Sequence, residues 1–445
     1  MTRKYLNHVT ITATVFSFLG LPAIGLAQEC GEGGNRHTRA ADIELSWSKR
    51  RDDPQTKQER YARALEKLEV AFAESPDESR AYLLAGEAYL GLRDYAGADS
   101  MLTKLVSMNG ACEEMVQEIR FQTWVGLYNS GINKLSAGAQ DEALASFETA
   151  SLIYEDARSL NNAASIYQNQ GENTRAADLY QRALDAGSDD ADMVRVATIN
   201  LAELLRAEGR TEESLALYSS YLADHPEDVI GRLNYAISLL NQQRSEEAQA
   251  IFGELLGRED LTFRQWTQVG IGLYRANNFT EAATAFGKAH EMRPLSKEVT
   301  ENLANTLYQV SDFEGLSPIA KSLTDMYPYE SRNYNLLANA HRELGDPEAA
   351  LAVLQRRDGL SFEFLSAQLV AQGENVYVVE GQVMNRSAEA GTQVSVLIEL
   401  LDESGEVVAS ETLLLELPDA DEASAFQVQL EVENEVAGFK YAMAQ

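Results

Sequence analysis

Small or aliphatic residues recur along this chain at a nearly constant spacing, each after a short acidic turn and usually four residues before an aromatic side chain. They are Ala64, Ala98, Ala143, Ala176, Ser214, Ala248, Ala282, Leu316 and Ala350. The successive gaps are 34, 45, 33, 38, 34, 34, 34 and 34 residues. A fixed period in this range is typical of stacked copies of one supersecondary unit. We therefore expect such an array over residues 41–357.

The segment from Leu261 to Pro294 gives the unit most clearly. Apolar residues spaced by three and four predict one helix before Asn277 and a second after Asn278. The first apolar face carries Trp266, Val269, Gly270 and Tyr274, and the second carries Ala282, Phe286 and Ala289. Because Gly270 and Ala282 are small, the two helices can approach closely. One hairpin cannot bury this apolar side alone, so successive units are expected to stack.

This order of aromatic, aliphatic, small and aromatic residues, followed by alanine, aromatic, alanine and proline, resembles the tetratricopeptide repeat family. The first unit, at about 41–78, is degenerate in its first helix but keeps Ala64, Ala71 and Pro76. The resemblance implies a mostly α fold, a right-handed α-solenoid of about nine helical hairpins, in which the first helices line a concave face. Arrays of this kind hold other molecules and rarely carry out chemistry.

Two gaps depart from the common period. The gap of 45 residues adds about eleven residues near 111–123, where Glu113–Gly131 predicts one continuous helix lengthened by about three turns. The gap of 38 residues adds four residues around Gly187–Asp192, which predicts a longer turn.

After Arg357 the hydrophobic period changes from 3.6 residues to 2. Alternating or β-branched segments predict strands at 362–371, 376–383, 392–401, 407–415, 426–432 and 439–442. Short strands at this spacing predict a small antiparallel β-sandwich over residues 358–445.

Two motifs in this part resemble the FxLYD-type immunoglobulin-like domain of exported bacterial proteins. The first consists of Gly381, Val383, Asn385 and Ser387, and the second of Ile398, Leu400, Leu401, Asp402 and Gly405. Isoleucine and leucine replace the phenylalanine and tyrosine of the family's name motif. The resemblance implies residence in the cell envelope and contacts made in adhesion or assembly.

Residues 1–27 have the pattern of a signal peptide. Arg3 and Lys4 precede an uncharged stretch, 9–27, that contains Pro22 and ends in small residues. The competing interpretation is a retained anchor, because the stretch just reaches bilayer length. Pro22 favours cleavage, which would leave 28–40 as a flexible N-terminal segment. We therefore expect a bacterial protein exported to the periplasm or associated with the outer envelope, with no transmembrane span in the mature chain.

The net charge of −32 disfavours a nucleic-acid partner, because both would be strongly negative. The excess is largest in residues 358–445, which hold 17 acidic residues against Arg386 and Lys440. Solvation of the surface accounts for such charge, and attraction for basic partners or divalent cations is the alternative.

Cys30 and Cys112 are the two cysteines of the chain. In an oxidising compartment they could pair and join the mature N-terminus to an early repeat. Spacing alone does not decide between this disulfide and two free thiols.

The residues that carry catalytic or metal chemistry do not form a recognisable set. The histidines His8, His37, His225, His290 and His341 show no metal-ligand spacing, and there is no phosphate loop or nucleophile motif. Asp419, Asp421 and Glu422 lack the spacing of a calcium loop, so a solvated acidic turn explains them better. We predict no enzyme activity, no cofactor and no metal.

The first helices of the last three full units carry the predicted binding residues. Asn305 and Asn339 occupy equivalent places one repeat apart, where an asparagine in peptide-binding members of the family can hydrogen-bond a ligand backbone. Glu301 stands where the carboxylate-holding members have lysine, so a C-terminal carboxylate ligand is disfavoured. The candidate groove comprises Arg264, Tyr274, Arg275, Glu301, Asn305, Tyr308, Asn339 and Arg342. The alternative is that these side chains are merely solvated.

These patterns favour one function and leave one alternative open. The expected function is that of an exported, non-enzymatic scaffold or adaptor that binds a partner protein or peptide in the groove of the array. The competing function is that of a glycan- or peptidoglycan-binding accessory module of an envelope assembly. The aromatic residues available to the sandwich for such a role are Tyr377, Phe439, Tyr441, Phe362, Phe364 and Phe426.

Overall fold

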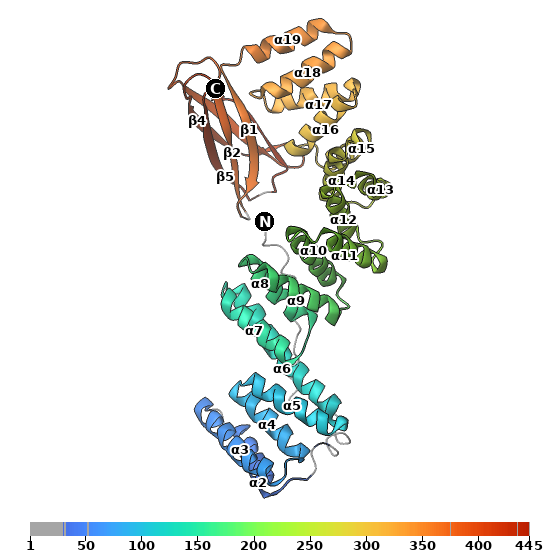
Figure 1. Cartoon of the computed structure of the whole chain (residues 1–445). Coiled ribbons are helices and arrows are strands. Elements are labelled where there is room, and N and C mark those ends of the chain that lie inside the picture. The colour runs from blue at the N-terminus through green and yellow to red at the C-terminus, as the bar shows by residue number, and fades with distance from the viewer. Residues whose placement is uncertain (1–29, 31–32, 51–52, 374, 434, 445) are drawn as a thin grey trace. The chain divides into compact units, whose positions relative to one another are not determined.

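The computed structural model describes residues 30, 33–50, 53–373, 375–433 and 435–444, so the predicted signal peptide 1–27 lies outside the described residues. The described chain forms two compact units, one up to Tyr221 and one from Leu222 onward. Figure 1 labels helices and strands of both units. The boundary falls inside a helix of the array and not at the change from helix to strand.

In the described residues of the first unit, all regular secondary structure is helical. Its helices are α2 (Arg36–Ser48), α3 (Pro54–Glu74), α4 (Ser79–Leu92), α5 (Tyr95–Met108), α6 (Glu113–Ser136), α7 (Gln140–Ile153), α8 (Ala157–Asn169), α9 (Asn173–Ala186), α10 (Ala191–Ala207) and most of α11 (Thr211–Asp224). A short 3-10 helix, η1 (Gly110–Cys112), precedes α6.

The described residues of the second unit form four more helical hairpins and then six strands. The helices are α12 (Val229–Asn241), α13 (Ser245–Leu256), α14 (Phe263–Arg275), α15 (Phe279–Met292), α16 (Lys297–Gln309), α17 (Phe313–Met326), α18 (Ser331–Glu343) and α19 (Pro347–Asp358). The strands are β1 (Phe362–Ala371), β2 (Val376–Asn385), β3 (Gln393–Leu401), β4 (Val407–Glu416), β5 (Ala423–Glu431) and β6 (Gly438–Met443).

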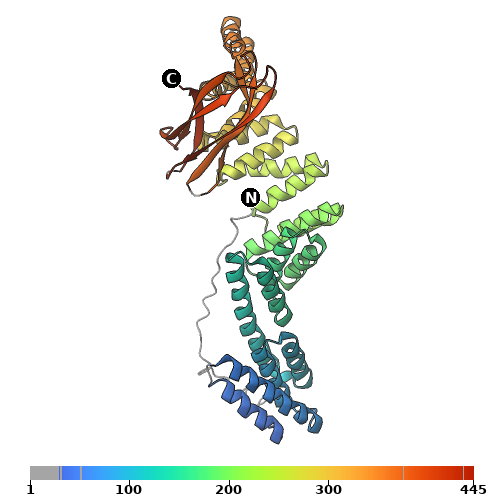
Figure 2. The ribbon, with the colours of Figure 1, turned by 90° about the vertical axis from the view of Figure 1, so that its left-hand side faces the viewer.

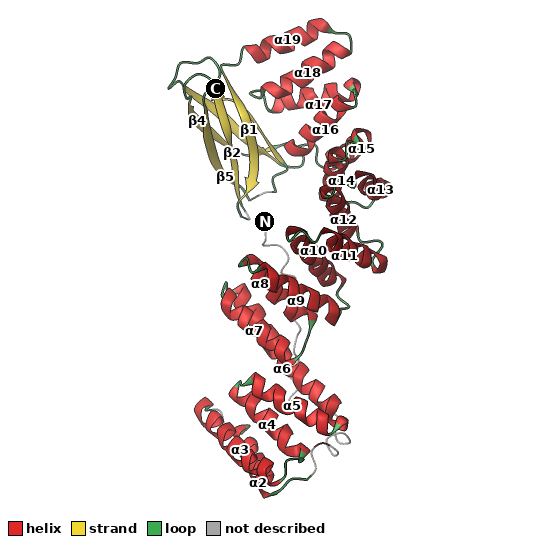
Figure 3. Cartoon of the chain, viewed as in Figure 1, coloured by secondary structure: helices red, strands yellow, loops and turns green. Residues whose placement is uncertain are grey.

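The expected fold class is confirmed. Helices α2 to α19 pair into nine hairpins within the described residues, and antiparallel strands follow them (Figure 3). The six strands begin within three residues of the positions that the sequence predicts.

The hairpin of α14 and α15 shows why this sequence folds as it does. Thr262 and Gln265 form a reciprocal capping box at the start of α14, and Asn278 caps α15. Asn277 takes the left-handed conformation, with φ of 58°, in the turn between them. A Cβ on Gly270 would lie 2.7 Å from the ring of Phe286, so glycine is what allows the two helices to pack this closely.

Two details of the array differ from expectation. Helix α2 begins at Arg36, inside the segment 28–40 that the sequence predicts to be flexible, because the Asn35 side chain accepts hydrogen bonds from the backbone N–H groups of His37 and Thr38. The four residues added near Gly187 do not lengthen the turn. They lengthen α10, which has 17 residues where α8 has 13.

The expected long helix near residues 113–131 is present and extends further. Helix α6 has 24 residues. Its Trp124 is fully buried, donates its ring N–H to the Ser159 hydroxyl at 2.7 Å and stacks under the Arg158 guanidinium. Helix α6 therefore contributes part of the core that it shares with α8.

The six strands form two three-stranded antiparallel sheets, in the orders β1-β2-β5 and β4-β3-β6. Figure 2 shows these strands as the arrows of the second unit. Leu400 of β3 lies opposite Phe439 of β6, and Gly381 of β2 lies opposite Phe426 of β5. The Phe364 ring of the first sheet meets the Tyr441 ring of the second, with centroids 4.8 Å apart. The aromatic core therefore joins the sheets into a sandwich.

The motif residues of the sandwich stabilise turns. Asn385 is fully buried, and its side-chain amide donates to the carbonyls of Ala388 and Pro418 at 3.0 and 2.8 Å. Asp402 accepts hydrogen bonds from the backbone N–H groups of Ser404 and Glu406, at 2.9 and 3.0 Å. Both side chains therefore hold backbone conformation.

No helix in the described part of the chain is long and apolar enough to cross a membrane. Within the same residues, no cluster of three or more His, Cys, Asp or Glu side chains is arranged to hold a metal ion.

Candidate binding face

The predicted groove residues lie on the first helices of three consecutive hairpins, α14, α16 and α18. Arg264, Arg275 and Arg342 are exposed, and the Tyr308 side chain is 38% exposed. Tyr274, Glu301, Asn305 and Asn339 are half-buried. We call this surface the first-helix face, and we define it by the following residues. They are Arg264, Ile271, Tyr274, Arg275, Glu301, Asn305, Tyr308, Arg332, Asn339 and Arg342.

Asn305 is held in place by two hydrogen bonds. Its side-chain N–H donates to the Glu301 carbonyl at 2.7 Å, and its side-chain oxygen accepts from the Arg332 guanidinium at 2.9 Å. Because Arg332 belongs to α18, this contact joins two successive first helices. A ligand that uses Asn305 must therefore share or replace the Arg332 contact.

A similar contact occurs two hairpins earlier. The Arg275 guanidinium of α14 donates to the side-chain oxygen of Asn241 on α12, at 2.8 Å. In both places an arginine meets a neutral amide of the preceding first helix. The amide fixes the guanidinium but leaves its positive charge uncompensated.

The two tyrosines of the face also pack within their own hairpins. The Tyr274 ring meets the Phe279 ring edge to face, with centroids 5.0 Å apart. The Tyr308 ring meets the Phe313 ring in the same way at 6.3 Å. Each tyrosine thus closes the end of a hairpin and presents its other side to solvent.

Glu301 lies at the border between the repeats and the sandwich. Its carboxylate is 3.3 Å from the Lys297 ammonium one turn earlier in α16. Lys297 also donates to the carbonyl of Ala367 on β1, at 2.8 Å. Strand β1 therefore lies against this end of α16, and Glu301 contributes to the junction as well as to the face.

The junction is built around a buried carboxylate. Glu330 is 7% exposed, lies 2.7 Å from the Lys297 ammonium and accepts a hydrogen bond from the Tyr441 hydroxyl at 2.7 Å. Burial raises the pKa of the Glu330 carboxyl, and the charge of Lys297 only partly opposes this shift. The Tyr441 side chain comes from β6, so one buried network connects α16, the turn before α18 and the sandwich.

Aromatic rings and a backbone bond extend the junction. The N–H of Phe364 on β1 donates to the Tyr329 carbonyl at 2.7 Å, and the Tyr329 ring stacks on Phe362 with centroids 4.8 Å apart. Arg386 donates to the Ser331 hydroxyl and to the Arg357 carbonyl, at 3.1 and 2.8 Å. The sandwich thus packs against the turns that connect the last repeats, as Figure 1 shows within this unit.

Sequence reasoning missed Arg332 and Ile271. Arg332 is the equivalent of Arg264 two repeats later, and Ile271 is the equivalent of Asn305 one repeat earlier. The fixed period is therefore a signal that could have found both. Asn241 could not be found in this way, because its role depends on the direction in which the Arg275 side chain points.

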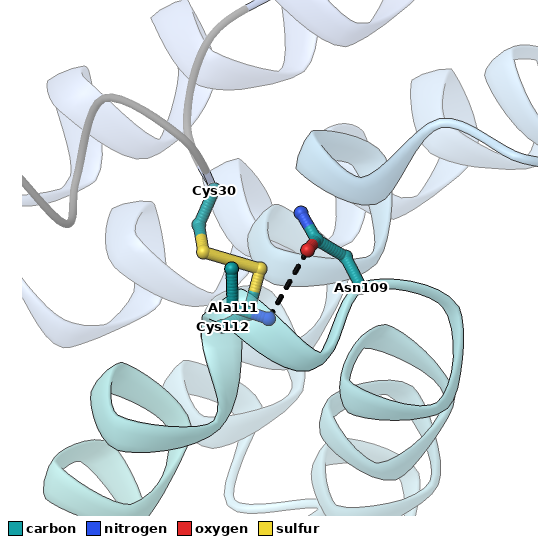
Figure 4. The surroundings of a disulfide bond; sticks show 4 residues. All are labelled: Cys30, Asn109, Ala111 and Cys112. Carbon is teal, nitrogen blue, oxygen red and sulfur yellow. Dashed lines mark hydrogen bonds between the residues drawn. A yellow bond between two sulfur atoms is a disulfide. The ribbon is translucent and has the colours of Figure 1, made fainter.

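The two cysteines form a disulfide in the first unit (Figure 4). Their Cα atoms are 5.5 Å apart, although the residues are 82 positions apart in the sequence. The Ala111 N–H donates to the Asn109 side chain in the turn that holds Cys112. Both cysteines are buried beside Leu102, Leu105 and Val116. The bond therefore joins the start of the described chain to the turn before α6.

Family models of the tetratricopeptide repeat match three segments of the chain, at residues 157–258, 55–117 and 334–356. Tetratricopeptide repeats are therefore present in this chain. No curated protein matches it in sequence.

Solved structures with some likeness include a tetratricopeptide repeat protein from Parabacteroides merdae, at 17% identity and a TM-score of 0.37, over 53% of this chain and 93% of that one. YrrB, described as a repeat protein with an unusual peptide-binding site, gives 17% identity and a TM-score of 0.33 over 47% and 97% of the two chains. Yeast Tom70 gives 12% identity and a TM-score of 0.33, over 72% of this chain and 88% of Tom70.

Proposed function

We propose that this protein is a non-enzymatic scaffold that binds a partner protein or peptide on the first-helix face, after export to the bacterial cell envelope. The observation that carries the proposal is the exposure of hydrogen-bonding and apolar groups on α14, α16 and α18, which are repeats of a kind that usually binds proteins. Ile271 is 37% exposed between Arg264 and Arg275, so apolar and polar groups alternate along α14. Such a mixture suits a peptide ligand.

Export is supported by two features. Residues 1–27 have the composition of a signal peptide, and the disulfide between Cys30 and Cys112 fits an oxidising compartment. The envelope is therefore the proposed location.

The sandwich is proposed to orient the last repeats and to offer a second contact. We also propose that the sandwich is a domain of the FxLYD type. The packing of Tyr329 on Phe362 and the burial of Glu330 against Tyr441 support the orienting role, because they fix the sandwich beside the first-helix face.

The competing glycan-binding function has less support. Sugar-binding platforms need exposed aromatic rings, but Phe362, Phe364, Phe426, Phe439 and Tyr441 are all buried. Tyr377 is half-buried, which leaves one partly accessible ring among the six that the sequence offered.

Affinity purification of the full chain from cross-linked cells tests the proposal. The variant Ile271→Asp with Asn339→Ala should lose the partner that the wild type recovers. The control is Thr284→Asp, a change at an exposed position on the second helix α15, which should recover the partner at the wild-type level. Equal recovery by all three proteins, or recovery of peptidoglycan and no protein, would contradict the proposal.

A further inference from the structure

Positive charge in the second unit is concentrated on the first helices. The first helices α12, α14, α16 and α18 carry six Lys or Arg residues and three Glu. The second helices α13, α15, α17 and α19 carry four Lys or Arg residues and nine acidic ones. In a chain with a net charge of −32, one side of this array is therefore basic.

Part of the positive charge on the first helices also differs in its partners from that on the second helices. On the second helices, Lys288 lies 3.3 Å from the Glu291 carboxylate and Lys321 lies 2.5 Å from that of Asp325. On the first helices, three of the six basic residues also have carboxylate partners, namely Arg232, Lys297 and Arg342. Two of the other three, Arg275 and Arg332, are held instead by the neutral side chains of Asn241 and Asn305.

No carboxylate of the described residues lies within ion-pair distance of Arg264, Arg275 or Arg332. An arginine that gives one N–H to an amide keeps further donors in a fixed fork, which matches a carboxylate. The first-helix face thus presents three guanidinium groups whose charge nothing in the described chain neutralises, and those of Arg275 and Arg332 are held in fixed orientations.

The spacing of these groups limits the shape of the ligand. Arg264 and Arg275 are eleven positions apart on α14, which places them about 16 Å apart along the helix axis. An extended peptide covers this distance in about five residues. The exposed Ile271 side chain lies between them in the sequence, where an apolar ligand side chain could pack.

We propose that the first-helix face binds an extended acidic segment of a partner protein, whose carboxylates pair with Arg264, Arg275 and Arg332 and whose aliphatic side chain packs on Ile271. This inference rests on the proposed function and names the chemistry of its ligand. Because the whole chain is strongly negative, it repels an acidic peptide at long range, so such binding must come from this local arrangement.

Fluorescence anisotropy with the full chain tests the inference. The probe is a labelled peptide of about ten residues that contains glutamates and two leucines, and the matched probes carry glutamine or lysine in place of glutamate. The glutamate peptide should bind at least about tenfold more tightly than the others, and raising the salt from about 0.05 to about 0.5 M should weaken it several-fold.

Paired variants localise the binding. Arg264→Gln with Arg275→Gln should weaken the glutamate peptide at least about tenfold. Lys288→Gln with Lys321→Gln removes the same charge from the second helices and should leave binding unchanged.

Equal binding of the glutamine peptide, or an equal loss in the second-helix variant, would overturn the inference. If no acidic peptide binds while purification still recovers a partner that depends on Ile271 and Asn339, this inference is wrong and the proposed function stands.

Discussion

At the scale of single residues, small side chains decide how closely the helices pack. The sequence predicts this role for Gly270, and the structure gives its physical reason in the ring of Phe286. The sequence also predicts that Asn305 and Asn339 occupy equivalent places on successive first helices, and they lie on α16 and α18. It could not predict that Asn305 holds Arg332, because that contact depends on the distance between two helices in neighbouring repeats.

Substitution of Gly270 by alanine should destabilise the protein. A new Cβ would meet the Phe286 ring at 2.7 Å, and the strain should exceed the gain in helix propensity, for a net loss of about 1–3 kcal/mol. Gly287 on α15 has no atom within 4 Å of its Cβ position, so Gly287→Ala should stabilise by about 0.5–1 kcal/mol. Urea unfolding of the wild type and both variants measures these changes in the free energy of unfolding. A stabilised Gly270→Ala variant would contradict the packing account.

At the scale of elements, hydrophobic periodicity predicts the helices and strands well because burial dictates it. It does not predict whether the extra residues of a longer repeat extend a helix or a turn. The four residues near Gly187 extend α10, because Asp190 acts as an early N-cap. Its side chain accepts hydrogen bonds from the backbone N–H groups of Asp192 and Met193. The junction between sandwich and repeats was also beyond prediction, because Lys297, Glu330 and Tyr441 are far apart in sequence.

The junction should make stability depend on pH. Because burial raises the pKa of Glu330 in the folded protein, the folded state takes up this proton before the unfolded state does as the pH falls. Glu330 therefore contributes more stability at about pH 5 than at about pH 7, and Glu330→Gln removes that change. In urea unfolding, the free energy of unfolding of the wild type should increase relative to that of the variant as the pH falls. A constant difference between the two proteins, or one that is larger at about pH 7, would count against the buried carboxylate.

At the scale of the whole molecule, a regular array and a change of period predict the fold class, but they do not predict the two compact units. The array divides at Tyr221 and Leu222, where the period of 34 residues continues without interruption. The partner also lies beyond the sequence, because the first-helix face is defined by contacts among hairpins.

The disulfide should stabilise the first unit. Closing a loop of this length lowers the entropy of the unfolded chain and is worth roughly 4 kcal/mol. Reductant should therefore lower the temperature of the first unfolding transition of the wild type. The variant Cys30→Ser with Cys112→Ser should already unfold at that lower temperature and should not respond to reductant. An unchanged wild-type transition would show that the bond adds no stability.

Photo-cross-linking from chosen positions tests most directly whether the first-helix face holds a protein ligand. A photo-reactive amino acid replaces Ile271 on α14 in one protein and Thr284 on α15 in the other, and both are exposed positions. In intact cells, the account predicts one discrete protein adduct from position 271 and none from position 284. The same adduct from both positions, or none from position 271 while other surface positions yield one, would contradict it.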